Sequence, residues 1–162
     1  MQFDVTIEIP KGQRNKYELD HDTGRIKLDR MLFTSTRYPA DYGFIEHTLG
    51  MDGDPLDALV ILDEPTFPGC HIHCRAVGML AVSVGNEPEP KILAVPRFDE
   101  SITWKELRDV PELLLHELGQ FFEIYKDLEP GKSSEVEGWR ERDEAEREIE
   151  QARSSRVGAR SG

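Results

Sequence analysis

The sequence predicts a mainly β protein, in which a small closed barrel is followed by two flanking helices. Between residues 2 and 95, short apolar or alternating runs are separated by turn residues. Many short strands in succession favour a closed barrel. After Asp109 the composition changes and apolar residues recur at helical spacing. A chain of 162 residues is long enough for one domain with a sizeable core.

The expected strands follow the turn signals. Residues 2–9 alternate between apolar and polar side chains, which is the period of a half-buried strand. Residues 16–20 and 26–28 flank the turn at 21–24 and predict a hairpin. Further strands are expected at residues 42–45, 58–62, 70–75, 77–84 and 91–95, with residues 85–90 connecting the last two.

Two helices are expected near the C-terminus. The first begins near Asp109-Val110-Pro111-Glu112, which combines a capping residue with a first-turn proline. Its apolar stripe predicts a core-facing side: Leu114, Leu118, Phe121, Phe122 and Tyr125. The second helix is expected at residues 139–153, with a thin apolar face that lies on the barrel or on a neighbouring subunit. Residues 154–162 are expected to be disordered, which leaves a single domain at residues 1–153.

The composition excludes several classes of partner. Thirty-two acidic and 20 basic residues give a net charge of −12, which disfavours nucleic acid and anionic membrane surfaces. We see no apolar run as long as a membrane span and no signal peptide before Met1. Two cysteines make no disulfide framework, so we expect a cytoplasmic protein.

The segment Asp52-Gly53-Asp54-Pro55-Leu56-Asp57 places three carboxylates in a turn that enters a buried strand. Crowded carboxylates raise one another's pKa unless cations lie among them. Mg²⁺ is the natural guest, because it prefers oxygen ligands and keeps several waters. An acidic, solvent-facing turn is the alternative. An EF-hand is disfavoured, because its sixth and twelfth positions would be Asp57 and Asp63 instead of glycine and glutamate.

Cys70-His71-Ile72-His73-Cys74 has the residue types of a zinc site. On a strand, however, the two histidines face one way and the two cysteines face the other. Four ligands cannot converge from opposite faces of one strand. We therefore interpret His71 and His73 as an exposed pair, of the kind that suits a subunit contact.

A further group of polar residues interrupts the core pattern at strand ends and turns. Carboxylates suit metal ions, whereas lysine, arginine and tyrosine suit phosphate oxygens. The group therefore favours a metal–phosphate site, although each member taken singly also fits a surface charge: Glu8, Lys16, Glu18, Arg30, Tyr42, Asp52, Asp54, Asp57, Lys91, Tyr125 and Lys126.

Nearly the whole chain, from about Phe3 to Ile149, resembles the soluble family I inorganic pyrophosphatases. The resemblance rests on motifs in matching order and spacing: Glu8-Ile9-Pro10, Lys16-Tyr17-Glu18, Asp29-Arg30, Tyr38-Pro39 with Tyr42-Gly43, Asp52 to Asp57, and Tyr125-Lys126-Asp127-Leu128. His21 and the Lys126–Lys132 run are similar to the actinobacterial branch. This resemblance implies an OB-like five-stranded barrel, a homohexamer, and Mg²⁺-dependent hydrolysis of inorganic diphosphate to two phosphates.

The resemblance also implies roles for individual acids. Asp52 and Asp57 resemble ligands of the metal pair that activates water, and Asp54 resembles the group that accepts or orients the water's proton. Glu8 and Glu18 resemble outer metal ligands. Two-metal catalysis lowers the pKa of a bridging water toward neutrality.

Substrate phosphates would be held by cationic and phenolic side chains, again by resemblance. The expected residues are Lys16, Arg30, Tyr42, Lys91, Tyr125 and Lys126, with Tyr38 in support. Several Mg²⁺ ions per site are implied, and they neutralise charge on the leaving phosphate.

The loop before Lys91 departs from the family pattern, which has two further aspartates there. Counted back from Lys91 without gaps, these positions hold Val84 and Glu89. Glu89 keeps a carboxylate and is still expected to bind metal or accept a proton, whereas Val84 cannot. Glu87 could substitute if the loop bends. We therefore predict that at least one metal is lost or weakly held.

Three functions remain open from the sequence. The first is an active pyrophosphatase, with activity reduced by Val84 and Glu89. The second is a degenerate paralogue that binds diphosphate or a nucleotide without turnover. The third is a hydrolase retuned to an organic diphosphate, with the altered loop admitting a larger leaving group.

Overall fold

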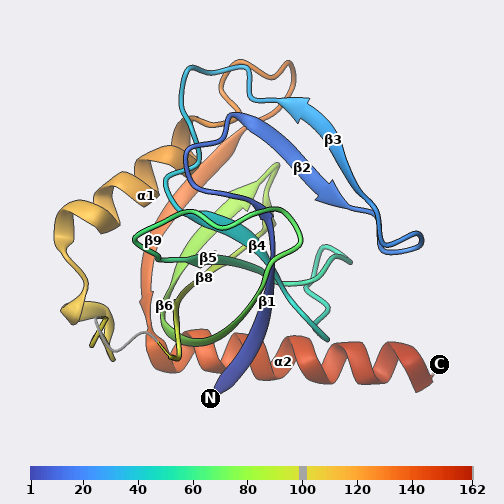
Figure 1. Ribbon diagram of the computed structural model, residues 1–162, viewed down its shortest axis with the longest axis vertical. Helices are drawn as coiled ribbons and strands as arrows, with labels where there is room; N and C mark the ends of the chain where they lie inside the picture. The colour runs from blue at the N-terminus through green and yellow to red at the C-terminus, as the bar shows by residue number, and fades with distance from the viewer. Residues whose placement is uncertain (99–101, 162) are drawn as a thin grey trace.

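The computed structural model, which describes residues 1–98 and 102–161, contains a closed five-stranded barrel (Figure 1). The strands pair in the order β1-β4-β5-β8-β6, and β6 pairs back with β1 to close the ring. Their bounds are β1 Gln2–Ile9, β4 Asp41–Ile45, β5 Asp57–Val60, β6 His71–Val84 and β8 Lys91–Pro96. The predicted fold class is confirmed. β5 and β8 are the parallel pair of the barrel.

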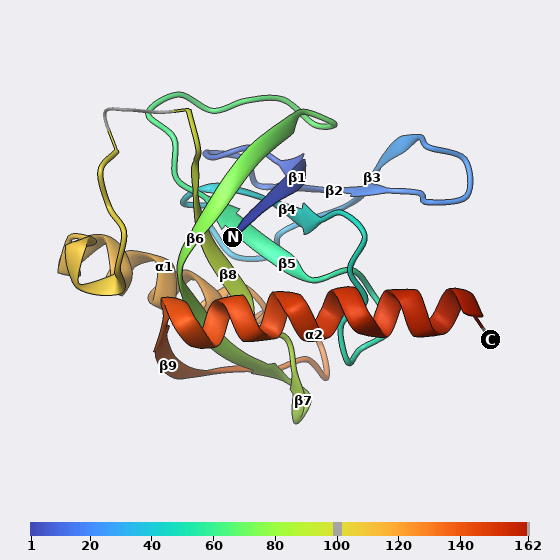
Figure 2. The same ribbon diagram turned by 90° about the horizontal axis from the view of Figure 1, so that it is seen from below.

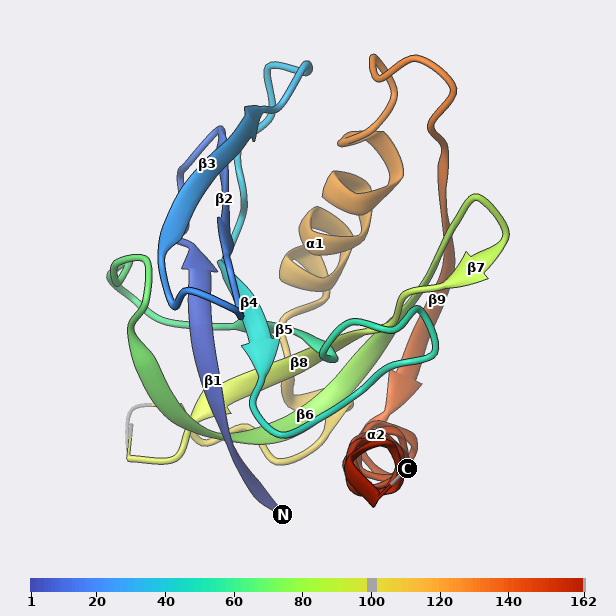
Figure 3. The same ribbon diagram turned by 90° about the vertical axis from the view of Figure 1, so that its right-hand side faces the viewer.

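The predicted hairpin is a separate two-stranded sheet, formed by β2 (Asn15–Leu19) and β3 (Ile26–Met31). It projects from the barrel beside the end of β1 (Figure 3). Most of β3 is exposed. One hydrogen bond ties the hairpin to β1, because the Leu19 N–H donates to Glu8 Oε2 over 2.9 Å.

β6 is longer than expected, because the two strands predicted at residues 70–84 form one strand with a bulge between Ala76 and Gly78. The C-terminal half of β6, from Gly78 to Val84, pairs with β9 (Ser134–Glu141), and its last two residues also pair with the short β7 (Glu87–Pro88). On β6, His71 and His73 are exposed whereas Cys74 is buried, as alternation predicts. His73 Nδ1 lies 2.7 Å from Asp4 Oδ1.

Within residues 102–161 the structure has one short and two longer helices. A 3₁₀ turn, Leu107–Asp109, precedes α1 (Glu112–Ile124), which begins after Pro111. Leu118, Phe121 and Phe122 of the predicted stripe are buried. No helix in the described part of the chain is long and apolar enough to cross a membrane.

α2 differs from its predicted bounds. Residues 139–141 belong to β9, and the helix runs from Arg142 to Ser161. Residues 154–161, expected to be disordered, are therefore helical, and residue 162 lies outside the described residues. No proline interrupts this segment, and the Arg153 side chain anchors the helix by donating to the Gln2 carbonyl over 2.8 Å. Figure 2 shows the last turns projecting beyond the barrel.

Both faces of the barrel strands carry apolar side chains that are buried in hydrophobic clusters. One cluster packs beneath α1 and includes Leu59, Leu93 and Phe122. The other packs beneath α2 and includes Ala58, Val60 and Ile149. Since neighbours on β5 point into different clusters, the strand is rigidly held, and so is the end at which its first residue, Asp57, stands.

Candidate active site

The site is built where strand ends meet. β5 and β8 run parallel, and their first residues, Asp57 and Lys91, are direct register partners. The Lys91 amine therefore lies 2.7 Å from Asp57 Oδ2, and it donates to Tyr42 Oη over 2.9 Å. Glu89 Oε2 is 3.7 Å away. Because only 1% of the Lys91 side chain is exposed, this ammonium is a fixed part of the site.

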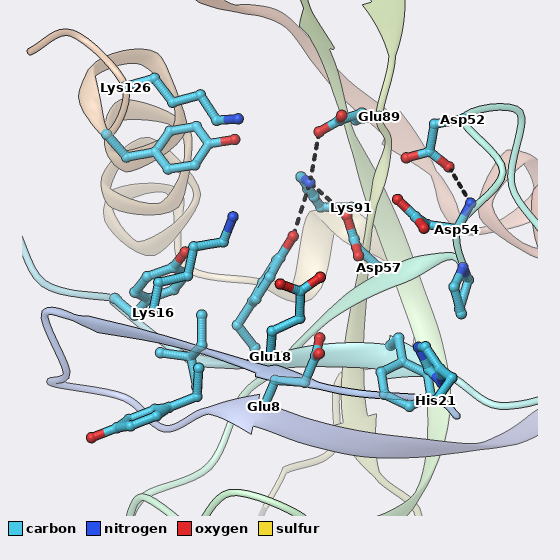
Figure 4. A pocket seen from close by; sticks show the side chains of 17 residues that line it. Glu8, Lys16, Glu18, His21, Asp52, Asp54, Asp57, Glu89, Lys91 and Lys126 are labelled. Atoms are coloured by element: carbon cyan, nitrogen blue, oxygen red, sulfur yellow. Dashed lines mark hydrogen bonds and ion pairs between the residues drawn. The ribbon is translucent and has the colours of Figure 1, made fainter. Parts of the chain in front are cut away.

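A cavity of about 180 Å³ opens over this cluster (Figure 4). Eleven of the twelve predicted site residues line it: Glu8, Lys16, Glu18, Tyr42, Asp52, Asp54, Asp57, Glu89, Lys91, Tyr125 and Lys126. Figure 4 shows Lys16 and Lys126 reaching in from one side, opposite the turn that carries Asp52 and Asp54. The cavity therefore has a cationic wall and an acidic wall.

Arg30 is the predicted residue that the structure does not place in the cavity lining. Its Nε lies 2.8 Å from Glu129 Oε1 and 3.7 Å from Asp29 Oδ2. Arg30 is paired in register with Lys16 on the hairpin, so it stands next to the cavity without lining it.

Local backbone geometry fixes the acidic turn. Gly53 has a φ of 87°, which favours glycine. The Asp54 N–H donates to Asp52 Oδ1 over 3.0 Å. The Gly50 N–H donates to the Asp54 carbonyl over 2.7 Å. Burial raises the pKa of Asp52, and the neighbouring charge of Asp54 adds to the effect.

Glu8 is the most perturbed carboxyl in the cavity. Burial raises its pKa to about 7. The Leu19 N–H opposes this shift, whereas the charges of Asp57 and Glu18 add to it. A carboxylate under such pressure is stabilised by a cation.

The donor set fits a hard divalent ion. The acidic residues of the cavity offer oxygen ligands, which Mg²⁺ prefers. Among the described residues, no three aspartate, glutamate, histidine or cysteine groups converge closely enough to enclose an ion by themselves. This arrangement suits Mg²⁺, which keeps several waters and takes few carboxylates together with substrate phosphates.

The tyrosines serve as hydrogen-bond donors. Burial raises the pKa of Tyr38, Tyr42 and Tyr125 above the ordinary value, and nearby charges, including that of Asp57, add to the shift. These phenols therefore stay protonated. By contrast, burial and the charge of Lys16 lower the pKa of Lys126.

The loop before Lys91 is a tight hairpin. Val84 and Glu87 are register partners, and Gly85 and Asn86 between them have φ values of 57° and 68°, as a two-residue type I′ turn requires. Val84 packs against the cluster beneath α1. Glu87 is exposed, and neither residue lines the cavity. Glu89 is the acid that this loop contributes.

Sequence reasoning did not assign a site role to His21, although it lines the cavity. Its ring meets Phe44 edge-on, with 5.0 Å between ring centroids. The signal in the sequence was its place in the hairpin turn, three residues after Glu18. Glu129 was also missed, because nothing in the sequence indicates its pairing with Arg30.

Comparison with known proteins gives one consistent result. The inorganic pyrophosphatase family matches residues 5–156. The chain is 61% identical over 153 residues to an inorganic pyrophosphatase of Streptomyces coelicolor, with 94% of each chain covered. It is 54% identical over 151 residues to one of Leifsonia xyli subsp. xyli, with 91% of each covered. The solved inorganic pyrophosphatase of Thermus thermophilus superposes with a TM-score of 0.93 at 41% identity, covering 96% of this chain and 91% of that one. The chain belongs to the inorganic pyrophosphatase family.

Proposed function

We propose that this protein hydrolyses inorganic diphosphate to two phosphates with the help of Mg²⁺. The observation that carries the proposal is the cavity itself, in which carboxylate oxygens that can bind cations lie together with ammonium and phenol groups that can bind phosphate. Family membership supports the same activity. A dianionic or tetraanionic substrate needs both walls, because the carboxylates alone would repel it.

Asp52, Asp57, Glu8, Glu18 and Glu89 would hold the Mg²⁺ ions. When bound, Mg²⁺ supplies an acidified water and neutralises charge on phosphate oxygens. The carboxylates of the acidic turn would hold the ions in fixed positions, since the turn is fixed by its own hydrogen bonds.

Asp54 would accept the proton of the attacking water. It stands on the same turn as Asp52, and its carboxylate faces the cavity (Figure 4). Glu89 is the second candidate for this role, because its carboxylate also lines the cavity. Its Oε2 lies 3.7 Å from the Lys91 amine, so the carboxylate stands at the buried end of the cavity.

Lys16, Lys126 and Lys91 would bind the phosphate oxygens electrostatically, while Tyr42 and Tyr125 donate hydrogen bonds. Arg30 would contribute from beside the cavity, through the positive charge of its guanidinium group. The leaving phosphate gains negative charge, so ammonium groups that face it lower the barrier.

The altered loop would leave the site with fewer or weaker cations. Val84 packs against the core and Glu87 is exposed to solvent, so Glu89 alone acts for this loop. Its side chain is one methylene longer than that of aspartate, and a displacement of about an ångström can cost about 100-fold in rate. We therefore propose an active enzyme with reduced turnover or a raised Mg²⁺ requirement.

The alternative of a nucleotide or prenyl diphosphate substrate is less favoured by the cavity. Pockets for drug-sized ligands occupy about 300–1,000 Å³, whereas this cavity has a volume of about 180 Å³. A small inorganic anion fits that volume better. We also propose a cytoplasmic homohexamer, on the basis of the family resemblance and the absence of a disulfide framework.

Phosphate release from diphosphate across a Mg²⁺ titration tests the proposal. The wild type is expected to release phosphate only when Mg²⁺ is present, and Glu89→Asp is expected to shift the titration to lower Mg²⁺. Val84→Asp with Glu89→Asp tests whether a second loop acid increases the rate, with thermal melting as the check on folding, because Val84 packs against the core. Binding of diphosphate without phosphate release would favour the degenerate paralogue.

A further inference from the structure

The ion pair between Arg30 and Glu129 lies outside the cavity lining, and the proposed chemistry does not use Glu129. The two side chains approach to 2.8 Å, between Arg30 Nε and Glu129 Oε1. The Glu129 side chain is 5% exposed, whereas that of Arg30 is 31% exposed. Burying a carboxylate is costly unless its partner is held in place.

The pair is incompletely satisfied. The Arg30 Nε–H is not aligned with an acceptor, so the contact is an ion pair rather than an aligned hydrogen bond. Glu129 Oε2 is buried and has no hydrogen-bond partner within residues 1–98 and 102–161. A buried carboxylate oxygen without a partner costs stability. Such a group calls for an explanation other than stability.

The pair joins two parts of the molecule that each carry site residues. Arg30 belongs to the β2–β3 hairpin, which carries Lys16 and Glu18, whereas Glu129 lies in the turns after α1, which carry Lys126. Figure 3 shows the hairpin and these turns at the same end of the molecule, on opposite sides. A two-stranded sheet is marginally stable alone, so the hairpin needs contacts of this kind.

Repulsion acts against the same arrangement. Lys16 and Lys126 both line the cavity, and they come from the two parts that the pair joins. Burial lowers the pKa of Lys126, and the charge of Lys16 lowers it further. Without an anion between them, like charges push the hairpin away from the turns. The Arg30–Glu129 attraction opposes that push.

We propose that Glu129 is a positioning residue that acts through Arg30. The ion pair between Arg30 and Glu129, which we call the clasp, holds the β2–β3 hairpin against the turns after α1. It thereby keeps Lys16 and Lys126 facing one cavity before the substrate binds. This inference rests on the proposed function for the identity of the anion, whereas the clasp itself depends only on the contacts described above.

Amide hydrogen exchange of the protein without metal or substrate tests the clasp independently of activity. Glu129→Gln removes the charge with little change in size, and Glu129→Ala removes the partner altogether. We expect exchange in residues 15–19 and 26–31 to accelerate about 10-fold or more in Glu129→Ala, and by less in Glu129→Gln. Exchange in β5 and β8 should stay unchanged. Glu123→Gln, an exposed charge on α1, is the matched control and should behave as the wild type. Unchanged hairpin exchange, or a uniform rise through the barrel, would overturn the clasp.

A double-mutant cycle on kcat/KM tests whether Glu129 acts through Arg30. Glu129→Gln should lower kcat/KM about 10-fold, mainly through a raised KM for diphosphate. In an Arg30→Met background the same substitution should change kcat/KM by less than about twofold. Losses that add in the double variant would contradict the assignment to Arg30. A wild type that releases no phosphate would refute the proposed function, and hydrogen exchange would still decide on the clasp.

Discussion

Asp41 and Glu8 are carboxylates at neighbouring strand ends, yet their surroundings differ. Asp41 opens β4 and is 1% exposed. It accepts hydrogen bonds from the Lys11 N–H, the Thr66 N–H and Thr66 Oγ1, over 2.8, 2.9 and 2.5 Å. Glu8 lies near the end of β1 and, among the described residues, accepts one hydrogen bond, from the Leu19 N–H. Its pKa is raised to about 7 by burial.

The difference separates acids that hold the fold from acids that await a ligand. The carboxylate oxygens of Asp41 accept hydrogen bonds from the protein itself. The cavity acids are crowded together and lack enough donors, so they gain stability when a cation binds. In the cavity, Glu8 shows this most clearly, because it is buried among other carboxylates and its pKa is raised.

Asp54→Asn should produce the largest effect. If Asp54 accepts the proton of the attacking water, kcat should fall about 10²- to 10⁴-fold, while the melting temperature should stay the same or rise because a crowded charge is removed. Steady-state phosphate release and thermal melting of the same preparation measure both quantities. A kcat within threefold of the wild type would transfer the role to Glu89.

Glu8→Gln should stabilise the metal-free protein. At pH 8 the carboxyl is ionised in both the folded and the unfolded states, and a pKa raised from 4.5 to about 7 corresponds to a penalty of about 3 kcal/mol. The penalty is absent below about pH 4.5, grows between about pH 4.5 and pH 7, and stays constant at higher pH.

Urea unfolding in the presence of a chelator, at pH 8 and at pH 4, checks this prediction. Glu8→Gln should exceed the wild type in unfolding free energy at pH 8 and match it at pH 4. Added Mg²⁺ should then stabilise the wild type more than the variant. Equal responses to Mg²⁺ would remove Glu8 from the set of proposed ligands.

Asp41→Asn should show the opposite pattern. An amide cannot accept all three hydrogen bonds and brings a donor to face other donors, so the unfolding free energy should fall by about 2 kcal/mol. The kcat of the folded protein should change less than threefold, because Asp41 does not line the cavity. A large loss of kcat without a loss of stability would break the distinction between the two acids.

Periodicity was enough to predict most of the barrel from the sequence. β9 was missed because few of its side chains face the core: Val136 and Trp139 pack against a cluster, and Gly138, with a φ of 124°, interrupts the alternation. The end of α2 was missed because its last turns have little apolar surface to signal a helix. These elements depend on pairing or anchoring to distant residues, which local pattern does not report.

For the site, the residue types were informative, whereas their orientation was not. The acidic turn, which precedes a buried strand, predicted that its own three carboxylates share one volume, whereas the spacing did not show that Lys91 would lie beside them. Arg30 was expected in the cavity, and the structure places it against Glu129, 99 positions further along the chain. Val84 does not line the cavity. Its direction is set by the two-residue turn at Gly85 and Asn86, which reverses the chain immediately after Val84.

A third buried ionisable group extends the comparison, with the smallest expected effect. Cys74 is fully buried on β6, and burial raises the pKa of its thiol to about 12. At pH 8 only about one molecule in 10⁴ carries the reactive thiolate. Cys70, just before β6, is partly exposed. A thiol reagent at pH 8 should therefore modify one cysteine in the native protein and the second only upon unfolding, with Cys70→Ser abolishing the fast phase. Because Cys74 has neither the donors of Asp41 nor a proposed cation, it stays neutral. Equal reaction rates at both thiols would mean that the region beneath α2 opens far more often than its packing implies.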